Sequence, residues 1–575
     1  MMMTRLIGVN AIKRDASVKC ADESQTITEI VMPQAASSTL AHRLIESLQH
    51  AAETTHPEQI HLLETHISQI ILTGEIAYKI KKPVNLGFLD FRTLQQRKYY
   101  CEEELRLNAR LAKALYLGIV TINGTPEKPV INGEGPVIEY AIRMRQFPQS
   151  AQLDNRLQQG LLTTENMEAL GDMLAAFHQS LPAANHEIEY GDTAHILKNV
   201  DDNLTVLAGY FYDDAHNTSK PNGGLSAEQQ ALARITDWVE TQNAALEETF
   251  IQRRRDGFTR ECHGDLHLKN LIWLDEQPIA FDCLEFDESL RWIDVMCEVG
   301  FLVMDLMSHQ QNTLAYAFLN QYLQHTGDYA GLTVLPYYIS YRAMVRAKVD
   351  TLRHQQAGIS PQELKVADSE LHSYLDLALH ISEPRQPMLI ITRGMSASGK
   401  STISKPLAAE LGAIRIRSDV ERKRLYKLQA TDSAANDIGT GLYSQAISAQ
   451  TYDKLLSLTE QVLSAGFHVI VDAVFMHKAQ RELFQRLAET KGYRFVILEF
   501  TASPDTLRER IVHRETGASD ADLPVLEHQL KQWQTLDNEE RKHQFVVNTE
   551  SRAVPQTLAN QLRRHHLVTD TPSAP

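Results

Sequence analysis

At 575 residues the chain is too long for a single hydrophobic core, so two to four domains are expected. It is 43% hydrophobic and 23% charged, as ordinary globular proteins are, and its net charge of −16 argues against an extended nucleic-acid-binding surface, which would be basic. The five cysteines form no C-x-x-C pair, which indicates neither a disulfide framework nor a zinc site and favours a reduced, cytoplasmic setting.

The first 36 residues have no apolar run like the core of a signal peptide, and their pattern is weak. We interpret 1–36 as a disordered or poorly ordered tail, or as the result of a start codon placed too early. No stretch approaches the roughly 18 uninterrupted apolar residues of a membrane-spanning helix, so no membrane partner is expected.

The next part of the chain predicts a small strand-rich lobe followed by a larger helical lobe. Helical periodicity starts near Leu40, and Gly74 separates two strand-like segments, which predicts a hairpin. The elements expected after it are a charged helix at 94–111, strands at 120–122 and 137–140, and helical stretches at 164–250 and 292–380.

A polar constellation in this region points to phosphoryl transfer. Transfer from ATP needs a base near the acceptor hydroxyl and oxygen ligands for Mg²⁺. Asp265 and Asn270 are five residues apart, the spacing of the base and the metal-binding Asn in a kinase catalytic loop. Asp282 ends a short apolar strand twelve residues after Asn270. The spacing predicts Asp265 as the catalytic base, with Asn270 and Asp282 as metal ligands.

Two rival interpretations of this segment stay open at this stage. His263, His267 and Asp265 offer a metal site, because an H-x-x-x-H pattern on a helix can bind zinc. The segment is otherwise a plain structural loop. Gly264 favours a loop over a helix, and the kinase interpretation explains more of the residues.

The loop has the form H-G-D rather than H-R-D, and it resembles those of aminoglycoside phosphotransferases and choline kinases. The resemblance implies a two-lobed, protein-kinase-like α+β domain over residues 37–381. It makes His263 a structural prop, while His267 either contacts substrate or packs. Asp294 and Asp305 either hold the catalytic loop by hydrogen bonds or cap helices or lie on the surface.

The same resemblance implies a phosphate-binding lysine paired with a glutamate. Strand alternation puts Lys79 and Lys81 on one face, and the Ala-x-Lys pattern favours Lys79, with Lys81 as the alternative. Among the three glutamates at 102–104, the family's spacing favours Glu104. No G-x-G-x-x-G loop precedes Lys79, and Asp282 lacks the glycine of D-F-G, so regulated protein kinases fit less well.

A proline-containing linker at 382–387 separates this domain from a second one at 388–568, with a frayed tail at 569–575. Strand and helix patterns alternate in the second domain, which predicts an α/β fold with a parallel sheet. An apolar strand, a G-x-x-x-x-G-K-S loop and a helix follow one another, as in a P-loop. The predicted nucleotide-binding residues are Gly394, Ser396, Ala397, Ser398, Gly399, Lys400, Ser401 and Thr402.

Further charged residues complete this prediction. Ser401 would bind Mg²⁺ and Asp472 would support it, and because Ala473 follows Asp472 where motor ATPases usually have Glu, a small-molecule kinase is favoured. Asp419, at the end of a short strand, is the candidate base. Other charges are interpreted as substrate clamps (Arg417 and Arg422), as lid arginines that stabilise the moving phosphoryl group (Arg510 and Arg514), or simply as surface charges, with the lid turn at 519–522.

Residues 388–565 resemble P-loop kinases of the gluconate-kinase and zeta-toxin type, which are loosely grouped as AAA-like. The stretches 78–91 and 281–286 are typical of bacterial bifunctional aminoglycoside phosphotransferase/ATP-binding fusion proteins, which the whole chain resembles. The resemblance implies a cytoplasmic enzyme that transfers the γ-phosphate of MgATP to small hydroxylated acceptors, with a site in each domain. The alternatives are that one domain is a nucleotide-dependent regulator of the other, or that the kinase acts on a protein.

Overall fold

The computed structural model describes residues 34–50, 60–85, 87, 89–212, 225–355, 359–426, 445–513, 522–551 and 554–564. The tail predicted at 569–575 and most of that predicted at 1–36 lie outside these residues. Helix α1 (Gln34–Gln49) already begins inside the predicted N-terminal tail, slightly before the domain start predicted at residue 37.

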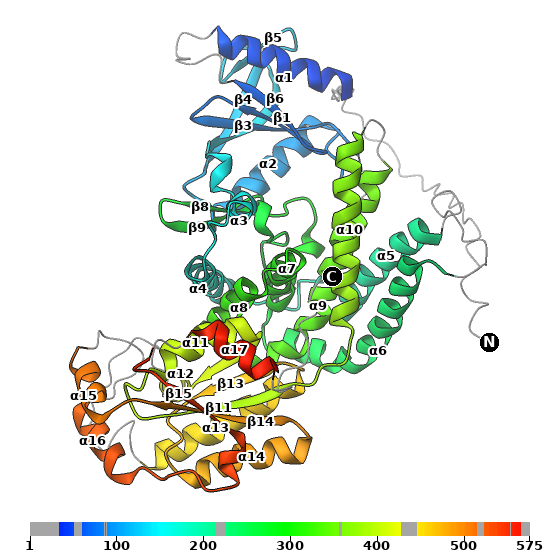
Figure 1. Ribbon diagram of the computed structural model, residues 1–575. Helices are drawn as coiled ribbons and strands as arrows, with labels where there is room; N and C mark the ends of the chain where they lie inside the picture. The colour runs from blue at the N-terminus through cyan, green and yellow to red at the C-terminus, as the bar shows by residue number, and fades with distance from the viewer. Residues whose placement is uncertain are drawn as a thin grey trace.

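The first lobe is built on one antiparallel sheet in the order β1-β2-β3-β6-β4-β5, at the top of Figure 1. Alternation along β3 sends Ile80 towards Leu44 of α1 and Ala77 towards Cys101 of α2, so the two helices cover opposite faces. Gly74, with φ +99°, turns β2 into β3 as predicted. The bounds are β1 His61–Glu64, β2 Ser68–Leu72, β3 Ile76–Lys81, α2 Leu94–Asn108, β4 Tyr116–Thr125, β5 Lys128–Ile131 and β6 Val137–Arg145.

The second lobe is helical and carries two short antiparallel strand pairs, β7 with β10 and β8 with β9. Trp292 was predicted to open a helix but lies in β10, because the Asp294 carboxylate caps the helix by accepting from Met296 N–H, so the helix begins only at Val295. The bounds are η2 Gln149–Ala151, α3 Leu153–Gln158, α4 Thr164–Ser180, α5 Thr193–Tyr212, α6 Ala227–Arg255, β7 Thr259–Glu261, η3 Leu268–Asn270, β8 Leu271–Leu274, β9 Gln277–Ala280, η4 Glu288–Leu290, β10 Trp292–Asp294, α7 Val295–Ser308, α8 Asn312–Thr326, η5 Tyr329–Thr333, α9 Leu335–His354 and α10 Pro361–Ile381.

The C-terminal domain has the predicted parallel sheet, with five strands in the order β12-β13-β11-β14-β15. The buried apolar runs of β11, β13 and β14 were visible in the sequence, whereas the more exposed edge strand β15 was not. The bounds are β11 Met388–Arg393, α11 Lys400–Leu411, β12 Ala413–Arg417, α12 Ser418–Leu425, α13 Gln445–Ser464, β13 His468–Asp472, α14 Lys478–Lys491, β14 Arg494–Thr501, α15 Pro504–Val512, α16 Leu523–Gln532, η7 Glu540–His543, β15 Gln544–Asn548 and α17 Pro555–Arg564.

The two domains pack directly against each other. Helix α8 of the first domain lies on α11 and β12 of the second, in the lower half of Figure 1. One apolar cluster runs across the junction and includes Tyr316 and Phe318 of α8 together with Ile414 of β12. The junction is therefore part of the protein's core rather than a loose linker contact.

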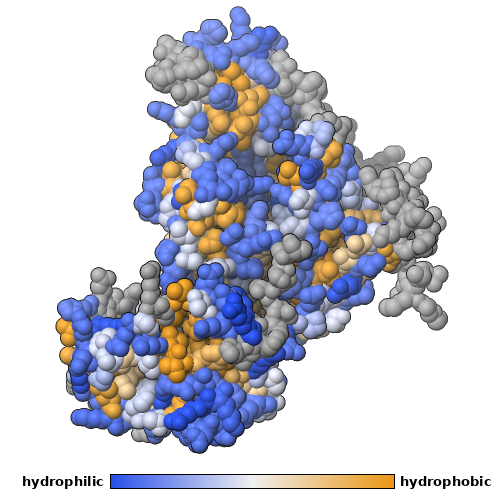
Figure 2. Space-filling model, in the orientation of Figure 1, coloured by the Kyte–Doolittle hydropathy of each residue, from blue (hydrophilic) through white to orange (hydrophobic). Residues whose placement is uncertain are grey.

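The face shown in Figure 2 is mainly hydrophilic, with separate apolar patches. Exposed apolar side chains such as Leu63 and Leu117 are ordinary on protein surfaces when they are scattered. Within the described residues, every helix is too short or too polar to cross a membrane.

Candidate active sites

Lys79 on β3 is the point where three distant segments of the first domain meet. Its Nζ lies 2.8 Å from Glu104 Oε1 on α2 and also forms an ion pair with Asp282, just after β9. Burial alone would raise the pKa of Glu104, but Lys79 and Lys81 lower it to about 2. Burial alone would lower the pKa of Lys79, but Asp282 and Glu104 raise it well above its usual value. Lys79 and Glu104 are therefore paired, as predicted, and both are charged at neutral pH.

Lys81, the alternative phosphate-binding lysine, lies on the same face of β3. Its Nζ is 2.7 Å from Glu104 Oε2 and also pairs with Glu285. The Lys81 side chain is fully buried, whereas Lys79 reaches Asp282, whose side chain is 43% exposed. Lys79 is thus the lysine that faces a carboxylate open to solvent. Glu285 belongs to the stretch 281–286, but its sequence context predicts no role for it.

Asp265 and Asn270 form the polar centre of the loop after β7. Asn270 Nδ2 donates hydrogen bonds of 2.8 Å to Oδ2 and 3.0 Å to the main-chain oxygen of Asp265. His267 Nε2 lies 3.4 Å from the same carboxylate. Burial would raise the pKa of Asp265, but His267 and Arg346 hold it well below its usual range. The group is a carboxylate at neutral pH and can accept a hydrogen bond from a hydroxyl.

Asp282 lies beside this centre and has a φ of +61°, a strained value for a residue with a side chain. Its N–H donates to the Tyr116 hydroxyl at 3.3 Å. The N–H of Phe281 donates to Asn270 O at 3.0 Å, which places Asp282 next to Asn270. Carboxylate and amide oxygens are the ligands that Mg²⁺ prefers, so Asn270 and Asp282 fit a magnesium site.

The rival zinc site is not supported, because His263 and His267 lie in a loop and each has another partner. His263 Nε2 is 2.9 Å from Phe281 O, which agrees with a structural role for this ring. His267 Nδ1 accepts from Lys269 N–H at 3.2 Å. Within the described part of the chain, the one cluster of His, Cys and carboxylate atoms close enough to share a metal comprises His178, Cys262 and Glu298.

Two carboxylates of helix α7 hold the Asp265 loop in place. Glu298 Oε1 accepts from Gly264 N–H at 2.7 Å, and Asp305 Oδ2 accepts from Leu268 N–H at 2.8 Å. Gly264 has φ +87°, and a Cβ there would lie 3.0 Å from Leu290 O, so the position requires glycine. Asp305 therefore holds the loop by a hydrogen bond, one of the roles considered from the sequence.

Asp294 takes the helix-capping role instead and also pairs with Arg253, whose Nε lies 2.6 Å from Asp294 Oδ2.

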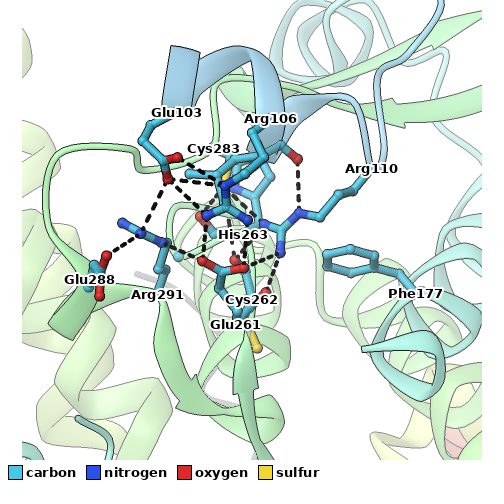
Figure 3. A network of polar contacts seen from close by, with 12 residues as sticks. Glu103, Arg106, Arg110, Phe177, Glu261, Cys262, His263, Cys283, Glu288 and Arg291 are labelled. Carbon is cyan, nitrogen blue, oxygen red and sulfur yellow. Dashed lines mark hydrogen bonds and ion pairs between the residues drawn. The ribbon is translucent and has the colours of Figure 1, made fainter. Parts of the chain in front are cut away.

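A network of arginines, drawn in Figure 3, ties α2 to the strand that enters the Asp265 loop. Arg106 Nη2 lies 2.8 Å from Glu261 Oε1, and Arg291 Nε lies 3.0 Å from the same oxygen. Arg110 Nη1 donates to Glu261 O at 2.6 Å. Because α2 also carries Glu104, the network fixes that carboxylate relative to the loop. Sequence reasoning missed it, since Glu261 is 155 positions from Arg106 on α2.

The P-loop follows the predicted order, with β11 leading into the loop and α11 beginning at Lys400. A cleft of about 1300 Å³ is lined by loop residues 396–403 together with Asp419 and Asp472. Helix N-termini and loops of inward-facing N–H groups suit anions such as phosphate. The loop is therefore placed at the wall of a space large enough for a nucleotide.

Two positions of the loop require glycine, one because other atoms lie very close to it and one because its backbone conformation is left-handed. A Cβ on Gly394 would lie 2.5 Å from Ser398 Oγ and 2.8 Å from Phe500 O, and Gly399 has φ +83°. Lys400 Nζ donates 2.8 Å hydrogen bonds to the main-chain oxygens of Gly394 and Met395. The Lys400 side chain thus lies across the loop that is predicted to bind the phosphates.

Asp472 ends β13 and is buried beside α11. Its Oδ2 accepts from Ser404 Oγ at 3.0 Å and lies 3.6 Å from Arg415 Nε. Burial would raise the pKa of Asp472, but Arg415 and other cations, with a hydrogen bond from Ser401, lower it below its usual value. A charged Asp472 bonded to Ser401 fits the predicted support of a metal ion.

The structure places Asp419 differently from the prediction. It lies in the first turn of α12 rather than at the end of a strand, because β12 ends at Arg417. Its carboxylate is 3.3 Å from Arg422 Nη1, and both residues line the cleft. Arg417 instead has Nη1 3.4 Å from Gln324 Oε1 of the first domain and lines a separate cavity of about 320 Å³ at the domain junction.

Arg510 on α15 also lines the cleft. Its guanidinium donates 2.8 Å hydrogen bonds to the Oγ1 and main-chain oxygen of Thr549 and a longer one to Ala397 O in the P-loop. Its predicted partner Arg514, and residues 519–521 of the predicted lid turn, lie outside the described residues.

Gln529 on α16 contacts the P-loop, which was not predicted from the sequence. Its Oε1 accepts a 2.8 Å hydrogen bond from Ser396 N–H in the P-loop.

The comparisons with known proteins agree with this order of domains. A model described as "Phosphotransferase enzyme family" matches residues 150–335, and one described as "AAA domain" matches 389–536. An uncharacterized protein of Mycobacterium tuberculosis (strain H37Rv) is 30% identical over 466 residues, which cover 81% of this chain and 88% of that protein. A protein of Mycobacterium bovis matches to the same extent. The chain belongs to their family.

As a member of this family, the chain joins a domain of the aminoglycoside phosphotransferase type to a P-loop, kinase-like AAA domain. The predicted fusion and fold class are therefore confirmed, and the fusion protein is a phosphotransferase of the kinase type.

Among solved structures, a choline/ethanolamine kinase family protein from Mesorhizobium loti is 11% identical, with 60% of this chain and 99% of that chain covered and a TM-score of 0.35. A sugar kinase from Janibacter sp. is 16% identical, with 31% and 93% covered and a TM-score of 0.24.

Proposed function

We propose that the fusion protein uses ATP in both domains and transfers the γ-phosphate to small hydroxylated acceptors. The observation that carries the proposal is the convergence of Lys79 on Glu104 and Asp282, which unites β3, α2 and the segment after β9. A buried lysine held between two carboxylates is costly to assemble unless its charge is used. Its position beside the Asp265 loop supports a nucleotide site with the parts that phosphoryl transfer needs.

In the first domain, Lys79 binds the phosphates of ATP, and Glu104 keeps the lysine extended towards them. Asn270 and Asp282 are the residues that would hold Mg²⁺, which offsets charge on the phosphates when it is bound. The oxygen of the acceptor hydroxyl bonds to the γ-phosphorus while the bond from the γ-phosphorus to the ADP oxygen breaks. Asp265 accepts the proton that the hydroxyl loses. The depressed pKa of Asp265 keeps the group ionised at neutral pH, so it can accept a hydrogen bond from the hydroxyl and then its proton.

In the second domain, the N–H groups of residues 394–402 and Lys400 bind phosphate oxygens. Ser401 and Asp472 would hold the metal ion. Asp419 is the base for a second acceptor, and Arg510 stabilises charge on the moving phosphoryl group together with Arg514. The placement of Asp419 and Arg510 on the cleft wall supports these roles.

The test is ATP consumption by the full chain against a panel of sugars, nucleosides, aminoglycosides and amino alcohols. Asp265→Ala and Lys400→Ala are run beside the wild type. We expect one acceptor to stimulate turnover that Asp265→Ala abolishes, and another to stimulate turnover that Lys400→Ala abolishes. If both sites bind ATP but no small acceptor stimulates turnover, the proposal is wrong, and labelling of a protein instead would identify a protein kinase.

The role of the second domain as a nucleotide-dependent regulator is favoured by one contact. The N–H of Ser396, which would face a phosphate, is already bonded to Gln529 of α16. A nucleotide would have to displace this side chain, so binding would move α16. Retained ATP binding at the P-loop, with no acceptor-dependent turnover lost in Lys400→Ala, would favour the regulator over the kinase.

A further inference from the structure

Asn320 of α8 binds the open edge of the C-terminal sheet. Its Nδ2 donates to Ala413 O at 2.9 Å, and its Oδ1 accepts from Arg415 N–H at 2.6 Å. Ala413 and Arg415 lie on β12, which has a neighbouring strand on one side only. The side-chain amide therefore takes the place of a missing neighbour strand, since it satisfies one donor and one acceptor of the edge as a strand would.

The strand held in this way leads directly into the P-loop site. The Arg415 side chain lies 3.6 Å from Asp472, and β12 continues into the first turn of α12, where Asp419 lies. Arg424 at the other end of α12 donates to Gln324 O in the last turn of α8 at 2.6 Å. A cation bonded to a helix C-terminus is a favourable contact. The β12–α12 segment is thus fastened to α8 at two points.

The same helix is bonded to the loop of the first site. The hydroxyl of Tyr322, two positions after Asn320, lies 2.9 Å from His178 Nδ1, and His178 Nε2 lies 2.8 Å from Glu298 Oε2. The other oxygen of Glu298 accepts from Gly264 N–H at 2.7 Å. These side chains are buried, so the bonds are shielded from water.

Close packing leaves α8 little freedom to move without its neighbours. Gly171 of α4 is so near that a Cβ there would lie 2.9 Å from Phe318 O of α8. Gln321 and His325 of α8 both bond Asp172 of α4. A shift of α8 would therefore be transmitted to both sites as a rigid displacement.

We propose that α8 couples the two sites energetically, with Asn320 as the positioning residue for the P-loop site and Tyr322 as the positioning residue for the Asp265 loop. The inference rests on the proposed function, because it takes both sites to bind nucleotide. Nucleotide at one site then changes the affinity of the other, and the change is equal in both directions, as linkage requires. The coupling is carried by the chain of contacts that runs from Gly264 through α8 to Asp472.

The test is calorimetric titration of the full chain with Mg²⁺ and a non-hydrolysable ATP analogue. Asp282→Ala empties the first site and Lys400→Ala empties the second, so each affinity is measured with the other site filled or empty. We expect a ratio of about 5-fold or more, the lower end of typical allosteric coupling. Asn320→Ala and Tyr322→Phe should each bring the ratio towards one while both sites still bind the analogue.

Asn312→Ala is the matched control, because Asn312 is an exposed asparagine in the first turn of the same helix. It should leave the ratio unchanged. If Asn320→Ala does not fold, Tyr322→Phe decides, since it removes one oxygen atom and keeps the ring. A ratio of one in the wild type, or an unchanged ratio in both variants, overturns the coupling alone. Absence of analogue binding at either site overturns the proposed function as well.

Discussion

The two candidate sites of this protein are built in opposite ways. In the first domain, Lys79 meets Glu104 from 25 positions away and Asp282 from 203 positions away. In the second, the P-loop supplies most of its predicted groups from the consecutive residues 394–402. The first site is a product of tertiary packing, while the second is largely a local backbone conformation supported by one carboxylate, Asp472.

This difference has a consequence for stability. The first site buries a lysine and a glutamate together, and a buried pair costs heavily when only one partner is removed. The P-loop presents main-chain N–H groups, which a substitution to alanine leaves in place. Variants of the buried pair in the first site should therefore affect folding as well as chemistry, and variants of the P-loop lysine should affect chemistry alone.

The largest effect expected is that of Asp265→Asn on turnover at the first site. Asparagine keeps the shape and can still accept from Asn270, but it cannot take a proton. We expect kcat to fall by about 10²- to 10⁴-fold, the usual contribution of a general base, with little change in nucleotide affinity. Single-turnover kinetics and calorimetry measure the two quantities. An unchanged kcat would exclude Asp265 as the base.

Glu104→Gln should destabilise the protein strongly, because two buried lysines lose their shared carboxylate. The expected loss in the free energy of unfolding is about 3–5 kcal/mol, as for other broken buried pairs. Glu102→Gln is the matched control on the same helix, since the ion pair of Glu102 with Lys98 is exposed and 3.7 Å long, and it should cost at most about 0.5 kcal/mol. Equal effects of the two changes in urea unfolding would contradict the structure.

The effect of Glu104→Gln should also depend on pH in one direction. The ion pairs with Lys79 and Lys81 lower the pKa of Glu104 in the folded state to about 2, from its usual 4.5. Its contribution is fully present above the unfolded pKa and is lost as the pH falls through the folded pKa. The stability difference between wild type and variant should therefore shrink between about pH 5 and pH 2. A difference that grows on acidification would rule out the ionised pair.

Lys400→Ala should lower turnover at the P-loop site by about 10²- to 10³-fold, as the removal of one charge-stabilising group does elsewhere. The free energy of unfolding should hardly change, which separates this variant from Glu104→Gln. Lys405→Ala is the control, because Lys405 lies on the same helix with an exposed side chain and pairs with Glu168 at the domain junction. A melting temperature of Lys400→Ala well below that of Lys405→Ala would contradict the proposed difference between the two sites.

The smallest effect expected is that of Tyr116→Phe. The hydroxyl accepts a 3.3 Å hydrogen bond from Asp282 N–H and lies 3.5 Å from Glu104 Oε1. Both contacts are long, so the loss of stability should be about 1 kcal/mol or less. A loss as large as that of Glu104→Gln, in the same urea titration, would show that the hydroxyl and not the carboxylate organises the first site.

The features that depend on neighbouring residues could be predicted before the fold was known. The loop from Gly394 to Ser401, the hairpin at Gly74 and the spacing of Asp265 to Asn270 were all predictable, because turns and strand–loop–helix units follow from local backbone preferences. The preference for Glu104 over its two neighbours needed the resemblance to known kinases, and the structure pairs it with Lys79.

Which distant groups meet depends on the packing of the folded chain and could not be predicted. The pairing of Arg106 with Glu261, of Ser396 with Gln529 and of Asn320 with β12 joins elements that no local pattern relates. The short strand at Trp292 and the edge strand β15 were missed for the same reason, since weak local preference is overridden by the neighbours that a segment finds. Packing fixes these contacts after the elements have formed, and the domain junction is where that packing joins the two sites.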